Sequence, residues 1–356
     1  MRPASRRARG RVFWLVPCQH AHACCHHLTS AARNTCASAI GMRPIVLSFS
    51  GSGHLLCYQL GVATILLCPK RSKWSQRFKL FAGSSGGAIA ASVCALLPRE
   101  RVEEFAVSVA CNGRSFDGVS EILRGEGPFA GASIGTVVQA ISQSQQLFLS
   151  ATHCRTGRNA LFSRFQSPVE LHRCILASAS IPSSLHPFDL LRSRAPTYPE
   201  ASGVIVDPAC ESDGGVAAAR DAPPGLPFSP HGEAYVDGGI SDTAPILPAS
   251  LRVHALTVSP ISGPRGRLTA STSGSERRAP DGAPLEHYHL CPEDDSPRVP
   301  WVAPRLAGMR CYLSRNNLQA MAAAGAGASP KKLEAWYGRG QSDAQRWLER
   351  WEPPPE

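Results

Sequence analysis

The sequence predicts an α/β fold with a mainly parallel central sheet. Residues 44–67 and residues 79–97 share one order, in which a short β-rich run leads through a glycine turn into an apolar, helix-like run. Strands that alternate with helices pack as a parallel sheet covered by helices. Two further strand-like runs lie within 234–250 and 251–260.

The segment between these units carries local signals of its own. Residues 100–150 are largely helix-like, and residues 146–165 indicate a hairpin whose turn lies near Thr156-Gly157. Residues 167–180 begin with a serine cap and carry an acid at the fourth position, which predicts a helix.

The chain divides into three parts. We expect a basic leader at 1–41, a catalytic domain at 42–260 with an irregular Pro-, Gly- and Ala-rich insertion at 190–232, and a C-terminal part at 261–356. That last part starts with a low-complexity loop and ends in a helix that packs on the domain. An apolar stripe on one face of this helix indicates core or interface packing: Leu333, Trp336, Tyr337, Ala344, Trp347, Leu348 and Trp351.

The charge of the chain is unevenly distributed. The formal net charge is +10, but six arginines and no acids lie in residues 1–41, which leaves only +4 on the remainder. We therefore predict no nucleic-acid partner. The first acid of the chain is Glu100. An Arg-rich, acid-free leader is typical of organelle transit peptides, and a disordered extension before a true start at Met42 is an equal alternative.

Cysteine usage favours a reducing compartment over a disulfide scaffold, because the 13 cysteines are odd in number, are scattered along the chain and include no C-x-x-C pair. The cluster at residues 18–27, CQHAHACCHH, matches no zinc-site spacing, so we predict neither a metal nor any other cofactor. No run of 18 apolar residues occurs that would predict a transmembrane helix.

A candidate nucleophile lies between the second strand and its helix. Gly83-Ser84-Ser85-Gly86-Gly87 matches G-x-S-x-G, the pattern of a serine held on a sharp strand-to-helix turn. A helix N-terminus favours negative charge beside such a serine. The plain alternative, a small-residue turn before a tightly packed helix, fits this motif equally well when it is taken alone.

A candidate base lies at Asp237, which closes an apolar strand before Gly238 and Gly239. A carboxylate beside Ser85 could take its proton directly and form a dyad. The alternative is an Asp-Gly turn, which we assign to the second copy at Asp213. A Ser–acid–His triad through His254 is a further alternative.

Four ordered motifs resemble the patatin-like phospholipase family, closest to the branch of adipose triglyceride lipase and adiponutrin: LSFSGSGHLLCYQLGVA, GSSGG, LASASIP and YVDGGISDTAP. The resemblance implies a three-layer patatin-like fold, Ser85 as nucleophile and Asp237 as proton acceptor. Gly83, Gly87, Gly238 and Gly239 complete the two motifs. It also implies that the amides of Gly51, Ser52 and Gly53 form the oxyanion hole.

The glycine loop departs from the family pattern at two positions. Leu56 stands where the family usually has glycine, and His54 stands where the branch often has an aromatic residue. A misshapen loop would favour a catalytically impaired lipid-binding or scaffold protein over an enzyme.

The function that these motifs predict is hydrolysis of acyl esters in lipids by a serine enzyme without a metal. The partner would be a lipid ester at a membrane or lipid-droplet surface, met from the cytoplasm or after import through residues 1–41. The sequence leaves triacylglycerol and phospholipid, and hydrolysis and acyl transfer, open as alternatives.

Overall fold

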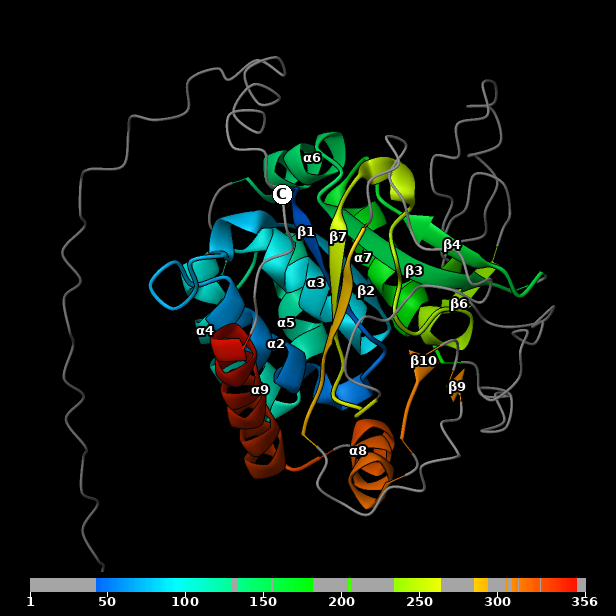
Figure 1. The fold of residues 1–356 in the computed structure, drawn as a ribbon. Coiled ribbons are helices and arrows are strands. Elements are labelled where there is room, and N and C mark those ends of the chain that lie inside the picture. The colour runs from blue at the N-terminus through cyan, green and yellow to red at the C-terminus, as the bar shows by residue number, and fades with distance from the viewer. Residues whose placement is uncertain are drawn as a thin grey trace, which may run out of the picture. The chain divides into compact units, whose positions relative to one another are not determined.

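A mostly parallel sheet organises the chain in the computed structural model (Figure 1). The structure describes residues 43–129, 133–154, 156–181, 204–205, 234–263, 285–293, 305–306, 309–312, 314–326 and 328–350. The leader, Trp351, most of the 190–232 insertion and the loop at 264–284 lie outside the described residues. The described residues from 43 onward belong to one compact unit.

Within the described residues the sheet has eight strands, of which seven follow the order β5-β6-β3-β2-β1-β7-β8 while β4 pairs with β3. β1, β2, β3, β7 and β8 run parallel to their neighbours in this set, whereas β4 and β6 are antiparallel to β3, and β5 is antiparallel to β6. The bounds are β1 Ile45–Phe49, β2 Phe78–Ser84, β3 Leu147–His153, β4 Asn159–Phe162, β5 Val204–Ile205, β6 Ala234–Asp237, β7 His254–Val258 and β8 His287–Leu290. A separate pair joins β9, Arg305–Leu306, to β10, Met309–Arg310.

Helices gather on one side of the sheet, to the left in Figure 1, where α2, α3, α4, α5 and α9 lie together. The helices are α2 Leu56–Leu66, α3 Gly86–Leu96, α4 Arg99–Ser108, α5 Ser115–Arg124, α6 Ile134–Gln143, α7 Pro168–Ala179, α8 Arg315–Ala326 and α9 Pro330–Arg350. No helix of the described residues is long and apolar enough to cross a membrane.

Two apolar clusters of the described residues pack on the two faces of the sheet. Alternate residues of β1 point to opposite faces. Leu47 and Phe49 join the large core that α2 and α3 complete. Val46 belongs to a smaller cluster on the other face, which Leu247 and Val253 cover from the segment before β7. In the described part of the chain, an irregular segment thus forms the outer layer on this second face.

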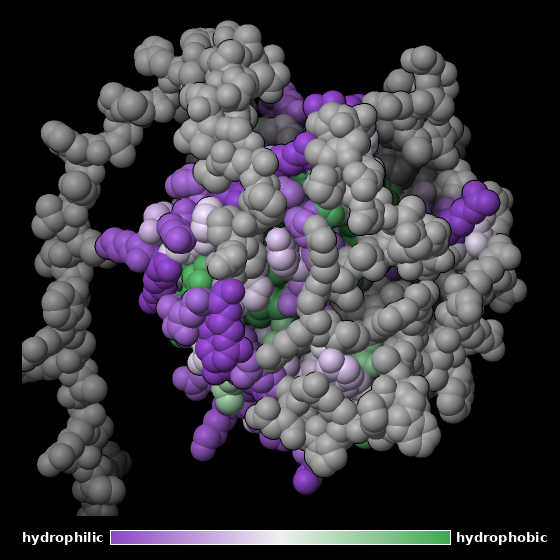
Figure 2. All heavy atoms as spheres, in the orientation of Figure 1, coloured by the Kyte–Doolittle hydropathy of each residue, from purple (hydrophilic) through white to green (hydrophobic). Residues whose placement is uncertain are grey.

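Helix α2 is buried along its whole length, because α9 covers its outer side. The two backbones approach so closely that a Cβ at Gly61 would overlap the carbonyl oxygen of Tyr337, and one at Gly340 would overlap that of Tyr58. The Tyr58 hydroxyl donates to Asp343 of α9 over 3.0 Å. Figure 2 shows hydrophilic side chains over the outward face of α9, so this helix separates α2 from solvent.

The structure confirms the α/β class, the mainly parallel sheet and several local predictions. β3 and β4 form the antiparallel hairpin expected at 146–165. Ser167 caps α7, and its hydroxyl accepts from the Glu170 amide over 3.2 Å. The stripe of α9 packs inward as expected, with Leu333, Tyr337 and Ala344 buried.

Candidate active site

Ser85 lies on the sharp turn between β2 and α3. Its φ of 54° and ψ of −127° are rare for a residue with a side chain, and the residue is only 8% exposed. The glycines on both sides of the turn allow it, because a Cβ at Gly83 would overlap the Gly87 carbonyl oxygen and one at Gly87 would overlap that of Phe49. The turn therefore needs small residues at both positions.

Asp237, at the end of β6, meets Ser85 across the sheet. The Ser85 hydroxyl donates to Asp237 Oδ2 over 2.6 Å, although the two residues are 152 positions apart in the sequence. The other carboxylate oxygen, Oδ1, accepts from the Gly239 amide over 2.7 Å. Gly238 allows β6 to approach β3, because a Cβ there would overlap the carbonyl oxygen of Ser150. The structure thus brings the expected serine and carboxylate together.

Burial changes the acid–base chemistry of Asp237. Asp237 is 4% exposed, and the desolvation of its carboxyl group raises the pKa from 3.8 to about 6, against the hydrogen bonds from Ser85 and Gly239, which lower it. A carboxylate with a pKa just below neutral is ionised at pH 7 and still has useful proton affinity.

The C-terminal end of α7 holds both members of the pair. Ser178 is fully buried, and its hydroxyl accepts from the Ser85 backbone N–H over 3.0 Å while donating to the Ser150 carbonyl over 2.6 Å. The Asp237 backbone N–H donates to the Ser180 carbonyl over 2.9 Å. The motif LASASIP contributes to the family resemblance, but nothing in the sequence predicts that Ser178 and Ser180 contact the pair.

The glycine loop after β1 lies against the first turn of α3. A Cβ at Gly86 would overlap the carbonyl oxygen of Gly53, and Gly53 itself has a φ of +50°, which favours glycine. Among the described residues, the backbone N–H groups of Ser52, Gly53 and Gly86 have no hydrogen-bond partner. These amides are the available candidates for binding an anion beside Ser85.

Gly51 differs from this expectation. Its N–H donates to the carbonyl oxygen of Thr243 over 2.8 Å, so it is already engaged. The Gly51 amide ties the loop to the segment after β6. As a correction, we leave Gly51 out of the candidate oxyanion donors, and Gly86 takes its place.

The two residues that depart from the family pattern, Leu56 and His54, do not distort the loop. Leu56 begins α2 with φ −56° and ψ −22°, which any residue adopts, and its side chain is buried in the core. His54 is exposed. The glycine missing at position 56 therefore strains no backbone.

His254 is far from Ser85. His254 begins β7 and pairs with Ile45 at the start of β1. The other end of β7, at Val258, pairs with Phe49, which in turn pairs with Gly83 next to the Ser85 turn. Four strand residues span about 13 Å. The His254 Nδ1 accepts from the Glu286 amide over 3.0 Å, on the opposite edge of the sheet from Ser85. The structure therefore contradicts a triad through His254.

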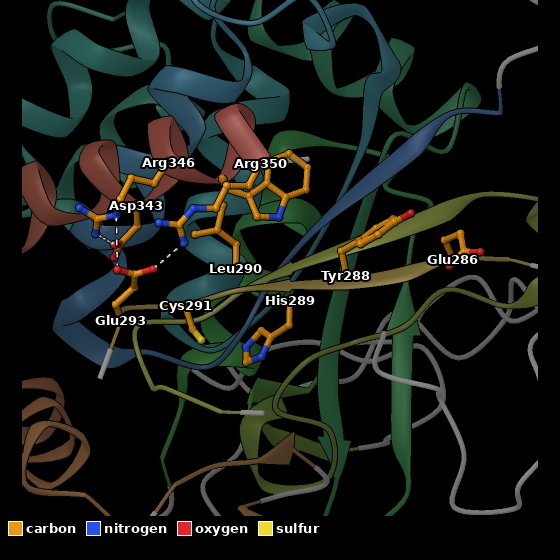
Figure 3. Close-up of a pocket in the computed structure, with 10 residues that line it drawn as sticks. Glu286, Tyr288, His289, Leu290, Cys291, Glu293, Asp343, Arg346 and Arg350 are labelled. Atoms are coloured by element: carbon orange, nitrogen blue, oxygen red, sulfur yellow. Dashed lines mark hydrogen bonds and ion pairs between the residues drawn. The ribbon is translucent and has the colours of Figure 1, made fainter. Parts of the chain in front are cut away.

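Two cavities lie away from this site. One, of about 490 Å³, lies between β8 and the last turns of α9, where Arg350 and Arg346 point to Glu293 (Figure 3). The other, of about 580 Å³, lies among α3, α5 and α6. Neither is lined by Ser85 or Asp237. In the described part of the chain, no three His, Cys, Asp or Glu side chains cluster as metal ligands would, and the cluster at 18–27 lies outside it.

The fold and the Ser85–Asp237 pair define an α/β protein with a serine elbow directly beside a buried carboxylate. The family model "Patatin-like phospholipase" matches residues 47–250, so the chain belongs to this family. Membership supports a lipid hydrolase or acyltransferase activity in general terms.

Individual relatives are more distant. The chain is 28% identical over 238 residues to Patatin-like phospholipase domain-containing protein 4 of Homo sapiens, covering 62% of this chain and 74% of that protein. It is 29% identical over 227 residues to 1-acylglycerol-3-phosphate O-acyltransferase Pnpla3 of Mus musculus, covering 61% of this chain and 44% of that protein. The solved structure of VipD from Legionella pneumophila is similar at a TM-score of 0.39 and 10% identity, covering 86% of this chain and 67% of that one.

Proposed function

We propose that this protein hydrolyses acyl esters of lipids with Ser85 as nucleophile and Asp237 as proton acceptor. The observation that carries the proposal is the 2.6 Å hydrogen bond from the Ser85 hydroxyl to the buried Asp237 carboxylate. A nucleophile and a base within hydrogen-bond reach are what covalent catalysis requires.

The proposed reaction has two halves. Ser85 Oγ attacks the ester carbonyl carbon while its proton passes to Asp237 Oδ2, and the alcohol leaves with that proton. Water then attacks the acyl-serine, Asp237 accepts a proton from the water, and that proton returns to Ser85 as the fatty acid leaves. Asp237 thus acts as base and acid in turn, which a pKa near 6 permits.

The developing oxyanion needs donors that are in place before the reaction. We assign this role to the N–H groups of Gly53 and Gly86, with Ser52 beside them. The close approach of the loop to α3 supports this assignment, since Gly53 and Gly86 are in backbone contact. Loss of one such donor costs about 10²–10³ in rate in other enzymes.

Acyl transfer is a second candidate, because one relative is named as an acyltransferase of 1-acylglycerol-3-phosphate. In that case a lipid hydroxyl replaces water in the second half-reaction, and the Ser85 and Asp237 roles are unchanged. A lipid-binding protein without turnover is the remaining alternative.

The test measures fatty-acid release from emulsified triacylglycerol and from phospholipid vesicles, each with and without 1-acylglycerol-3-phosphate as acceptor. Wild type should release or transfer acid, and Ser85→Ala and Asp237→Asn should abolish both. Ser84→Ala is the matched control, because the buried Ser84 hydroxyl has no partner among the described residues. A folded wild type that is inactive on every lipid and is not labelled by a fluorophosphonate would refute the proposal.

A further inference from the structure

Helix α8 lies at the same edge of the sheet as the candidate active site. It packs against the 3-10 helix Gly53–Leu55 (η1), and Figure 1 shows it below the sheet. The contact is a backbone contact, because a Cβ at Gly53 would overlap the carbonyl oxygen of Ala324. The helix is therefore adjacent to the loop that carries the proposed oxyanion donors.

A buried asparagine fixes the orientation of α8. Asn317 is 3% exposed, and its Oδ1 accepts from the Ser262 amide over 2.7 Å. Its Nδ2 donates to the Ser262 carbonyl over 2.8 Å and to the Tyr312 carbonyl over 2.7 Å. Ala320 is buried one turn further along, so the Asn317 side of the helix faces the protein.

The other side of α8 presents apolar side chains to solvent. Leu318 is 56% exposed and Met321 is 41% exposed, and both appear among the few exposed large apolar residues of the described chain. Arg315, Gln319 and Ala322 are exposed on the same side. An exposed apolar face that adjoins a binding site is typical of an interaction surface.

The charge pattern around α8 selects the partner. Residues 296–333 contain six cations and no acid, and acids flank this stretch at Asp295 and Glu334. Three of these cations, Arg315, Lys331 and Lys332, are exposed at α8 and at the start of α9. Apolar side chains flanked by cations suit a lipid surface, whose acyl region takes the former and whose phosphates pair with the latter.

We infer that the exposed face of α8, formed by Leu318 and Met321 with Arg315, Lys331 and Lys332 beside it, docks the protein onto a phospholipid surface next to the catalytic site. The inference rests on the proposed function for its choice of a lipid partner. Docking there would bring the loop and Ser85 to the surface that holds the ester.

The test uses the full chain with Ser85→Ala, so that binding is measured without turnover. Flotation with vesicles of phosphatidylcholine and phosphatidylserine should recover this protein in the lipid fraction. Adding Leu318→Gln and Met321→Gln should weaken vesicle binding about tenfold or more. Val107→Gln, which changes an equally exposed apolar residue on α4, is the matched control and should bind as before.

Activity on a monomeric short-chain ester separates this inference from the proposed function. With Ser85 intact, the Leu318→Gln, Met321→Gln protein should hydrolyse p-nitrophenyl butyrate at the wild-type rate while losing activity on vesicles. If wild type is inactive on the short ester and on vesicles and Ser85 is not labelled by a fluorophosphonate, the proposed function fails while the flotation result still stands. The docking inference would be overturned if the Leu318→Gln, Met321→Gln protein bound vesicles as well as the Val107→Gln protein. It would also be overturned if the parent Ser85→Ala protein did not bind vesicles.

Discussion

Ser178→Ala tests how the strained turn at Ser85 is held. The substitution removes the acceptor of the Ser85 N–H and the donor to the Ser150 carbonyl, both inside the protein. A buried N–H without a partner costs about 1–3 kcal/mol. A backbone conformation like that of Ser85 costs about 1–3 kcal/mol and persists only where its surroundings hold it.

The two energies are of the same size, so the turn should relax in a substantial fraction of molecules. We expect kcat to fall about 10- to 100-fold, since each 1.4 kcal/mol is a factor of ten. KM should change little, because Ser178 is buried behind the turn. The pH at which activity rises should not move, because the molecules that stay active keep the contacts of the Asp237 carboxylate.

The assay combines initial rates on a short ester with the rate of fluorophosphonate labelling of Ser85. Ser180→Ala is the matched control, since within the described residues the Ser180 hydroxyl bonds to the Leu176 carbonyl of its own helix over 2.6 Å and not to the pair. Ser178→Cys should recover part of the rate, because a thiol is a weak donor and acceptor. Wild-type labelling by Ser178→Ala, or equal damage by Ser180→Ala, would refute the reasoning.

Four further predictions concern acidity, packing and the loop. Since desolvation raises the pKa of Asp237 to about 6 and the base must be ionised, kcat/KM should rise about tenfold per pH unit below pH 6 and level off above it. Burial also raises the pKa of Asp242 from 3.8 to about 6, so the protonated carboxyl favours the folded state. This contribution to stability is complete below pH 3.8 and is lost as the pH rises through 6. The urea midpoint should therefore fall between pH 3.8 and 6, and it should fall less in Asp242→Asn. Gly340→Ala should destabilise the fold by about 1–3 kcal/mol in urea unfolding, because it forces α9 away from α2. Leu56→Gly should cost about 2–5 kcal/mol of stability in the same assay, because it empties a core position, without raising kcat on a short ester.

Each of these has an outcome that contradicts it. An activity profile flat from pH 5 to 8 would exclude Asp237 as the titrating base, and an unchanged pH dependence of stability in Asp242→Asn would exclude that carboxyl as its source. Gly338→Ala is the control for packing, since a Cβ there meets nothing within 4 Å, and equal effects of the two alanines would contradict the close approach at Gly340. A rise in activity in Leu56→Gly would show that the leucine limits the site.

Local sequence patterns predicted the local structure well. The turn at Ser85, the cap of α7 and the inward stripe of α9 follow from a few neighbouring residues, whose spacing determines the backbone conformation or the buried face. The partnership of Ser85 with Asp237 was one of several alternatives from the residues alone, and the family resemblance selected it, because no local rule links residues 152 positions apart.

The contacts that the sequence did not predict all join distant segments. Ser178 binds an amide 93 positions away, and Gly51 donates to a carbonyl beyond β6. Hydrogen bonds to backbone atoms carry little sequence signature, because every residue offers the same N–H and C=O groups. Such partners become visible only when the strands are placed side by side.

The position of β7 beside β1 limits how short a fragment of this chain can be made. The family model ends at residue 250, yet β7 pairs with the whole of β1, the strand that leads into the glycine loop. A fragment that stopped at 250 would leave β1 as an open edge and would uncover α2, whose outer side α9 protects. Exposed strand edges and apolar helices promote aggregation. A piece of this chain that keeps both the strand pairing of β1 and the cover of α2 therefore extends to about residue 350.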